Sequence, residues 1–422
     1  KIGTGPGLDA VIAGDRFNRR YLQLKMELAT ANPLATPVVH SVAIDAEFKE
    51  AYPIPLHKNI HVLEIENPAV RYPSIAWEWE AADRPEFSKL RRQENLDEVV
   101  AGARTQYEAQ LRLLDYAKKR WEWSAPSPEY PEWDALSIVA RVNKGGGGGM
   151  CIQQNLFFIG LCQAFGWQGR LVGLDGHEVA EVWSDDYGKW IYFDAYFPNH
   201  CLCDPDTGEP LGMLEIHARY LDYFYPNRPM DWATDYRLNL DEIRNRTDKP
   251  RVVRSSFTYH NHALNEYTGF MQSRILRMLP RTNFFAKTHP RPVAHDGGGY
   301  FWDGYVSWYD ARTPIRGQYA RYTNRPRDLW PDLNTVHVTA SQGYGNDRLF
   351  LEFETYTPGF SHFEISADAG AWKIVDERWT WLLVPGRNTL LIRAVSLAGN
   401  RGKPARLAVN RVAVPLHEWK TQ

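Results

Sequence analysis

The stretch GGGGGMCIQQNLFFIGLCQAFGWQGRLVG, residues 145–173, decides the interpretation of this chain. Five glycines lead into Met150 and Cys151, and an apolar run then ends at Gly166. Residues 152–165 are dense in apolar side chains and contain no proline, which predicts a helix that is buried on nearly every side. A glycine commonly stands just past the end of a helix. Cys151 is therefore expected in the first turn of a buried helix.

This position of Cys151 suits a nucleophile. The first turn of a helix has unpaired N–H groups and the positive end of the helix dipole, and both favour a thiolate over a thiol. The glycines before it permit unusual backbone angles and the close approach of a substrate. The plain alternative is a buried structural cysteine behind a flexible linker, because cysteine is among the most buried residue types.

A β-hairpin is predicted downstream of the helix. Residues 167–173 predict one strand, and the runs HEVAEVW and KWIYFDAY predict a hairpin with SDDYG as its loop. His177 and Asp194 are equally far from a tip at 185–186, which predicts that they lie across from each other within hydrogen-bond reach. Alone, each is more typical of an ordinary strand or turn residue. Together with Cys151 they make the nucleophile, base and orienting acid of acyl-transfer chemistry.

The order of these motifs resembles the transglutaminase-like superfamily. The motifs that match are Gly149-Met150-Cys151, Phe165 to Arg170, His177 to Trp183, Trp190, and Asp194-Ala195. Their spacing is similar to that of peptide:N-glycanases and of bacterial transglutaminase-like proteases. The resemblance covers roughly residues 95–225 and implies a papain-like α+β core whose thiolate attacks a carboxamide carbon. The five consecutive glycines, and Val179 where many members have an aromatic residue, depart from the family pattern without removing a catalytic group.

The resemblance and the residue chemistry give the same roles. Cys151 is expected to be the nucleophile, His177 the base that later protonates the leaving amine, and Asp194 the group that orients the imidazole. The backbone N–H of Cys151 is expected to be one oxyanion donor. The weaker candidates for the oxyanion site or the cleft are Trp133, for which Trp121 and Trp123 compete, and Gln153 and Gln154. Ordinary packing is the plainer interpretation of these weaker candidates. Arg170 is expected to pair with a carboxylate in the core.

The rest of the chain predicts β-structure around a helical segment. Residues 1–46 alternate as strands with turns, 53–90 suggest loops and short strands, 96–121 have helical periodicity, and 133–143 predict a second short helix. From Asn334 onward, six regularly spaced runs predict an antiparallel β-sandwich of immunoglobulin or fibronectin type. These runs are NTVHVTA, RLFLEFET, HFEISAD, WTWLLV, NTLLIRAVS and ARLAVNRVAV.

The predicted fold class is α+β, with a transglutaminase-like (papain-like) core and a C-terminal antiparallel β-sandwich. We expect four divisions: an N-terminal β-rich segment over 1–94, the catalytic core over 95–250, an aromatic, loop-rich connector over 251–330, and the sandwich over 331–422.

Composition limits the partners and cofactors. The 422 residues have a formal net charge of −2, which gives no sign of a nucleic-acid or anionic-membrane partner, and no apolar run is long enough to span a bilayer. Four cysteines do not form a disulfide framework in a chain of this length. The cluster His200, Cys201 and Cys203 lacks a second pair of zinc ligands, so a disulfide or two packed thiols is expected there. We predict no metal, and no cofactor motif is present.

The sequence therefore predicts a cysteine hydrolase that cleaves an amide or glycosylamine bond in a peptide, glycopeptide or cell-wall polymer. Aromatic residues make up 13% of the chain, and their rings either pack in the core or stack on a substrate. With the sandwich, they favour an extracellular polymer partner and a secreted or periplasmic location. One alternative is a polysaccharide lyase or glycosidase with His177 as base and acids or tyrosines from 187–305 as partners. Another is a catalytically retired binding protein. Oligomeric state is left open.

Overall fold

The computed structural model describes residues 59–121, 133–174, 177–196, 201–224, 253–254, 276–286, 292–294, 300–302, 304–308, 321–342 and 345–413. All of these residues belong to one compact unit, Tyr52–Gln422. The strands that the sequence predicts within residues 1–46, and the candidate Trp123, lie outside the described residues.

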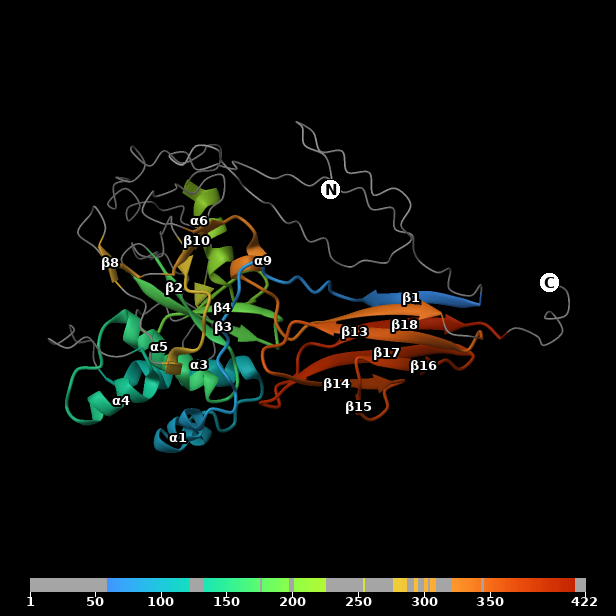
Figure 1. Cartoon of the computed structure of the whole chain (residues 1–422), viewed down its shortest axis with the longest axis horizontal. Coiled ribbons are helices and arrows are strands. Elements are labelled where there is room, and N and C mark those ends of the chain that lie inside the picture. The colour runs from blue at the N-terminus through green and yellow to red at the C-terminus, as the bar shows by residue number, and fades with distance from the viewer. Residues whose placement is uncertain are drawn as a thin grey trace, which may run out of the picture. The chain divides into compact units, whose positions relative to one another are not determined.

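A six-stranded sheet organises the core (Figure 1). Its order is β11-β10-β7-β2-β3-β4, and each neighbouring pair is antiparallel except β10 and β11. The strands are β2 (Gly169–Gly173), β3 (Glu178–Ser184), β4 (Lys189–Phe193), β7 (Arg277–Met278), β10 (Val306–Trp308) and β11 (Tyr322–Thr323). Smaller pairs are β5 (Leu202–Cys203) with β6 (Val253–Arg254), and β8 (Pro292–Ala294) with β9 (Tyr300–Trp302).

Helices cover both faces of this sheet. One face packs on a hydrophobic cluster formed by α1 (Pro85–Gln93), α2 (Leu96–Val99), α3 (Gln106–Lys119), α4 (Ala135–Asn143) and α5 (Cys151–Gln163). The other face packs on α6 (Met213–Phe224) and on Leu329 of α9 (Pro326–Leu329). The 3₁₀ turn Phe284–Ala286 contributes Phe285, whose ring centroid lies 5.2 Å from that of Phe87 on α1.

The predicted continuous helix over 96–121 is wrong, because two helices occupy this segment. The helix α2 ends at Val99, and α3 begins at Gln106. The hydroxyl of Thr105 caps α3 by accepting a hydrogen bond from the Glu108 backbone N–H at 3.1 Å. A threonine that caps a helix start competes with continuation of the preceding helix. The apolar periodicity that suggested one helix belongs mainly to the buried face of α3.

The helix α5 matches the sequence expectation closely. It begins at Cys151, and all of its other residues are buried, as the apolar character on every side predicts. It packs against α3, α4 and the strands β2 and β3. The nucleophile candidate thus stands at the end of the most enclosed helix of the core.

A buried ion pair lies on the opposite face of the sheet. Arg170 on β2 and Glu181 on β3 have fully buried side chains, 2.8 Å apart. Glu181 also accepts hydrogen bonds from the Met213 backbone N–H at 2.7 Å and from the Trp330 indole at 3.0 Å. Burial lowers the pKa of Arg170 to about 10, against the opposing effect of the Glu181 charge. The expected pairing of Arg170 with a core carboxylate is confirmed, and it attaches the start of α6 to the sheet.

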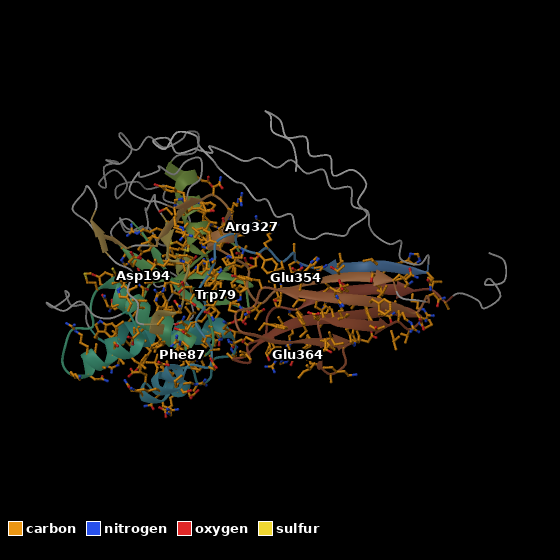
Figure 2. All side chains as sticks on the ribbon, in the orientation of Figure 1. Trp79, Phe87, Asp194, Arg327, Glu354 and Glu364 are labelled. Carbon is orange, nitrogen blue, oxygen red and sulfur yellow. The ribbon has the colours of Figure 1, made fainter. Side chains whose placement is uncertain are left out.

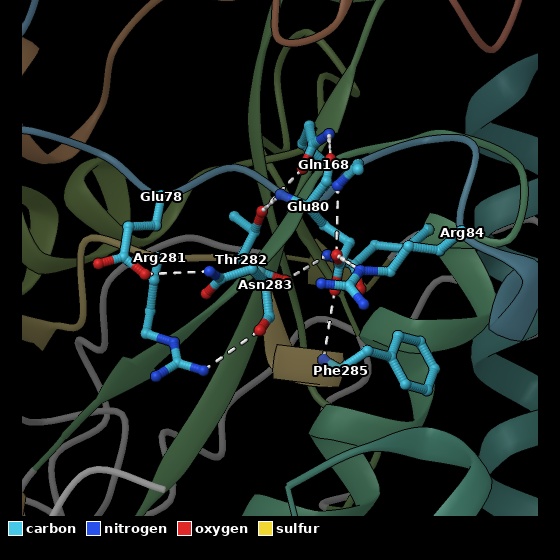
Figure 3. A network of polar contacts seen from close by, with 10 residues as sticks. Glu78, Glu80, Arg84, Gln168, Arg281, Thr282, Asn283 and Phe285 are labelled. Atoms are coloured by element: carbon cyan, nitrogen blue, oxygen red, sulfur yellow. Dashed lines mark hydrogen bonds and ion pairs between the residues drawn. The ribbon is translucent and has the colours of Figure 1, made fainter. Parts of the chain in front are cut away.

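A polar network holds the segment around Glu80 against the start of β2 (Figure 3). The Thr282 hydroxyl accepts from the Glu80 backbone N–H at 2.8 Å and donates to the Gln168 side chain at 2.9 Å. Glu80 forms an ion pair with Arg84 and accepts from the Phe285 backbone N–H at 3.3 Å. Apart from Glu80 and Arg84, these partners are more than 80 residues apart in sequence, so the network closes the core around non-local contacts.

The C-terminal residues form an antiparallel β-sandwich. One sheet has the order β1-β18-β17-β14-β15 and the other β12-β13-β16, around one hydrophobic cluster. The strands are β1 (Ile60–Glu66), β12 (Val336–Gln342), β13 (Arg348–Thr355), β14 (Phe360–Ala367), β15 (Lys373–Val375), β16 (Arg378–Leu382), β17 (Gly386–Ser396) and β18 (Ala405–Arg411). The edge strand β1 precedes the core in sequence, so the sandwich includes a strand outside the predicted 331–422 segment.

Replacing Arg170 with methionine should destabilise the fold. The R170M variant leaves Glu181 buried without its cation, which costs about 3–5 kcal/mol of unfolding free energy. The matched control is R91M, because the Arg91–Asp97 pair has side chains 40% and 70% exposed and should contribute at most about 1 kcal/mol. Denaturant unfolding measures both. Equal losses in the two variants would contradict the importance of the buried pair.

Replacing Asp185 with asparagine should stabilise the fold at neutral pH. Burial raises the pKa of Asp185 to about 6, although hydrogen bonds from Asn334 and Trp183 oppose this. The folded state therefore favours the protonated acid, and this advantage is lost as pH rises from about 4 to 6. We expect D185N to gain about 1–3 kcal/mol at pH 7–8 and little at pH 4. Unfolding curves across pH measure the difference, and a gain that is constant with pH would refute the cause.

Candidate active site

Three elements bring Cys151, His177 and Asp194 together. Cys151 is the first residue of α5, and His177 directly precedes β3. Asp194, which is labelled in Figure 2, directly follows β4. Cys151 is partly exposed, whereas His177 and Asp194 are buried, with 3% and 0% of their surface exposed. The nucleophile candidate is thus the one member of the set that solvent reaches.

His177 and Asp194 are hydrogen-bonded although the predicted register is wrong. Nε2 of His177 lies 2.8 Å from Oδ2 of Asp194. The last pair of the hairpin is Ser184 with Lys189, so the turn has four residues, and Ala180 lies opposite Phe193. The two side chains are therefore diagonal neighbours, offset by two residues from direct opposition. Diagonal neighbours at strand ends are still within reach of long side chains.

Electrostatics keep the His177 ring protonated. Burial would lower the pKa of His177, but the Asp194 charge and hydrogen bonds to Asp194 and to the Cys151 side chain raise it to about 10. For Asp194, burial favours the neutral acid, but the His177 charge and hydrogen bonds hold its pKa below the ordinary value. At neutral pH the pair is an imidazolium and a carboxylate, with the cation in contact with Cys151.

Tyr196 and Asn155 complete the surroundings of the pair. The Tyr196 backbone N–H donates to Asp194 Oδ1 at 2.8 Å, and its ring centroid lies 5.8 Å from that of His177. Burial and the charges of Cys151 and Asp194 raise the pKa of Tyr196. Asn155, which is fully buried one turn into α5, donates to Asp194 Oδ1 at 3.4 Å. The sequence analysis missed both residues, although the spacing of Asn155, four residues after Cys151, was a usable signal.

The glycine run shapes the start of α5. Gly149 has φ +108°, and a Cβ there would lie 2.6 Å from Oε1 of Gln153. That oxygen accepts a hydrogen bond from the Met150 backbone N–H at 2.9 Å, which caps the helix. A residue with a side chain at position 149 would therefore strain the backbone and displace the cap. The last glycine is required to seat Cys151 at the helix start.

The weaker site candidates occupy different places. Trp121 lies over Gly148, where a Cβ would come within 2.2 Å of the indole ring. Its Nε1 is buried and has no hydrogen-bond partner among the described residues. Trp133 is 4% exposed and packs in the hydrophobic cluster, Gln153 caps the helix, and Gln154 is 4% exposed. Oxyanion or cleft roles for Trp133, Gln153 and Gln154 stay predictions.

Beside His177, a buried ion pair between Arg277 and Glu178 spans the three strands β7, β2 and β3. Glu178 pairs with Gly173, and Gly173 pairs with Arg277 across the neighbouring strands. Because Gly173 has no side chain, Arg277 reaches across it, and its guanidinium lies 3.3 Å from Glu178 Oε1. Tyr305 donates to the same oxygen at 3.4 Å. Arg277 and Tyr305 come from distant segments, and no local sequence signal connects them to the site.

Cysteines outside the site are packed thiols. None of the four cysteines is in a disulfide, and Cys162, Cys201 and Cys203 are buried. Within the described ranges, no group of three or more His, Cys, Asp or Glu side chains could hold a metal ion. No helix in the described part of the chain is long and apolar enough to cross a membrane.

The comparisons with known proteins agree with the motif analysis. Residues 93–195 match the family model of the transglutaminase-like superfamily, and this segment contains Cys151, His177 and Asp194. No curated protein matches the sequence. The chain is also similar to the crystal structure of red sea bream transglutaminase, with 9% identity over 85% of this chain and 78% of that one, but its TM-score of 0.23 is too low to inform fold or function. Residues 93–195 are therefore a transglutaminase-like core, as the resemblance predicts.

Proposed function

We propose that this chain is a cysteine hydrolase that cleaves an amide or glycosylamine bond through Cys151, His177 and Asp194. One observation carries the proposal: a buried His177–Asp194 pair, 2.8 Å apart, is hydrogen-bonded to a partly exposed Cys151 at the start of a buried helix. Nucleophile, base and orienting acid in mutual contact are the arrangement that thiol acyl transfer requires.

The proposed reaction has two halves. The Cys151 thiolate attacks the carbonyl carbon, and the imidazolium of His177 gives its proton to the departing amine nitrogen as the C–N bond breaks. The neutral imidazole then takes a proton from water, whose oxygen attacks the thioester carbon. The C–S bond breaks, and the thiolate and imidazolium are regenerated. An amine in place of water would complete an acyl transfer by the same steps.

The oxyanion formed in each half needs donors. The backbone N–H of Cys151 lies in the first turn of α5, where N–H groups have no intrahelical acceptor. We propose the Trp121 indole as the second donor, because a buried N–H without a partner costs about 1–3 kcal/mol unless a ligand satisfies it. Trp121 contacts the loop three residues before Cys151. It thus replaces Trp133 as the preferred candidate.

The proposed substrate is an extracellular peptide, glycopeptide or cell-wall polymer, with a secreted or periplasmic location. Its support is the C-terminal β-sandwich and not the tryptophan content. Among the described residues with large exposed apolar side chains there is no tryptophan, so the tryptophans described do not form an exposed stacking platform.

A second candidate is a carbohydrate-active enzyme. Its support is the Glu178–Tyr305 contact beside His177, which supplies a carboxyl group and a phenol on one face of the sheet. Burial raises the pKa of Glu178 against the effect of the Arg277 charge, as a proton-donating group requires. This reaction would not need the Cys151 thiol. Turnover by C151A would therefore favour it over the cysteine mechanism.

Alkylation with iodoacetamide tests the proposed nucleophile. We expect Cys151 to be labelled selectively in the native protein at pH 7, because the imidazolium of His177 stabilises the thiolate. H177A should slow this labelling at least tenfold. Turnover should fall as pH rises through about 10, where His177 loses the proton that the leaving amine needs. Labelling of Cys151 no faster than Cys162, located by mass spectrometry, would reject the thiol mechanism.

Replacing Trp121 with phenylalanine tests the oxyanion assignment. W121F keeps an aromatic ring over Gly148 and removes the N–H, so kcat should fall about 100-fold to 1000-fold. Alkylation of Cys151 should be unchanged, because displacement of iodide creates no oxyanion. W133F is the matched control and should retain near wild-type kcat. Loss of turnover in W133F with normal turnover in W121F would return the role to Trp133.

A further inference from the structure

The structure assigns a positioning role to Asn155, a residue with no part in the bond-breaking steps. We propose that its carboxamide is the common anchor that fixes Cys151, His177 and Asp194 relative to one another. The inference rests on the proposed cysteine mechanism and deepens it. Asn155 is fully buried on α5, so its contacts are with the protein interior and not with solvent.

The first contacts of Asn155 join the helix to the histidine strand. Its Nδ2 donates to the Cys151 carbonyl oxygen at 3.0 Å and to the Glu178 carbonyl oxygen at 2.8 Å. Cys151 is the nucleophile candidate, and Glu178 is the residue directly after His177. One amide nitrogen therefore sets the separation between the backbone of the thiol and the backbone beside the imidazole.

The remaining contacts join the same side chain to the acid strand. Nδ2 lies 3.4 Å from Oδ1 of Asp194, the oxygen that does not bind His177. The Oδ1 atom of Asn155 accepts from the Ala195 backbone N–H at 3.0 Å. The amide thus holds both the Asp194 carboxylate and the backbone that follows it.

The chemistry of a carboxamide explains why asparagine fits here. An amide supplies two N–H donors and a carbonyl acceptor on one short side chain. Aspartate would retain the acceptor for Ala195 but lose the donors to Cys151 and Glu178, and it would add negative charge beside Asp194. Alanine would remove every contact. Because near-attack geometry is sensitive to displacements of about 1 Å, loss of this anchor should cost about 100-fold in rate.

The experiment compares N155A and N155D with wild type, using iodoacetamide as the probe and the full chain as the sample. We expect Cys151 alkylation at pH 7 to slow at least tenfold in both variants. The pH dependence of alkylation should also change, since the contact between Cys151 and the imidazolium is altered. With an active substrate, kcat should fall with KM nearly unchanged. N155S replaces N155A in the comparison if N155A does not fold.

The matched control is Q163A at the other end of the same helix. Gln163 is also a buried amide, 2% exposed, and its Nε2 donates to the Thr282 carbonyl oxygen at 2.7 Å. Q163A should lower the thermal midpoint yet leave Cys151 alkylation at the wild-type rate and pH dependence. Wild-type alkylation in N155A and N155D, with only a lower thermal midpoint, would overturn the positioning role while the proposed function stands. An inert Cys151 in the wild-type chain would instead reject the proposed function, and Asn155 would then be structural only.

Discussion

The site depends on one constraint, which is that the His177–Asp194 pair is buried. Two charges removed from water are tolerated only when each is paired and hydrogen-bonded. Here the carboxylate receives the imidazole on one oxygen and the donors of Asn155 and Tyr196 on the other. His177 also forms a hydrogen bond with the Cys151 side chain. The carboxylate of Asp194 outweighs the effect of burial on the ring and therefore holds an imidazolium next to Cys151.

The strand β3 has a buried carboxylate on each face of the sheet, and the two carboxylates have different partners. On one side, Glu178 meets Arg277 next to the site, and on the other, Glu181 meets Arg170. Arg170 comes from the adjacent strand β2, whereas Arg277 reaches over β2 from β7, so each pair joins strands as well as satisfying a carboxylate. The Arg170 pair also receives the start of α6 and Trp330. These contacts join the hairpin that holds the site to β7, to α6 and to Trp330.

The sequence predicts those features of the site that local chemistry determines. The buried helix after Cys151, the hairpin and the presence of His177 and Asp194 at its open end follow from periodicity over short stretches. The register of the hairpin did not follow, because a turn centred on residues 185–186 and one centred on residues 186–187 differ by a backbone choice that SDDYG does not determine. The helical break before Thr105 was missed for a similar reason, since apolar periodicity continued through it.

The contacts between segments that are distant in sequence could not be predicted from local patterns. The strand β1 completes the sandwich from a position before the core, and Arg277 enters the site about 100 residues after Glu178. Asn155 is an intermediate case, because its spacing from Cys151 was visible but its partners were not. Its amide contacts the backbone at Cys151, Glu178 and Ala195 together with the Asp194 carboxylate, which only the folded arrangement of α5, β3 and β4 brings within reach. A residue of this kind acts through geometry, so the three catalytic candidates can be read from motifs while the group that holds them is found only in the fold.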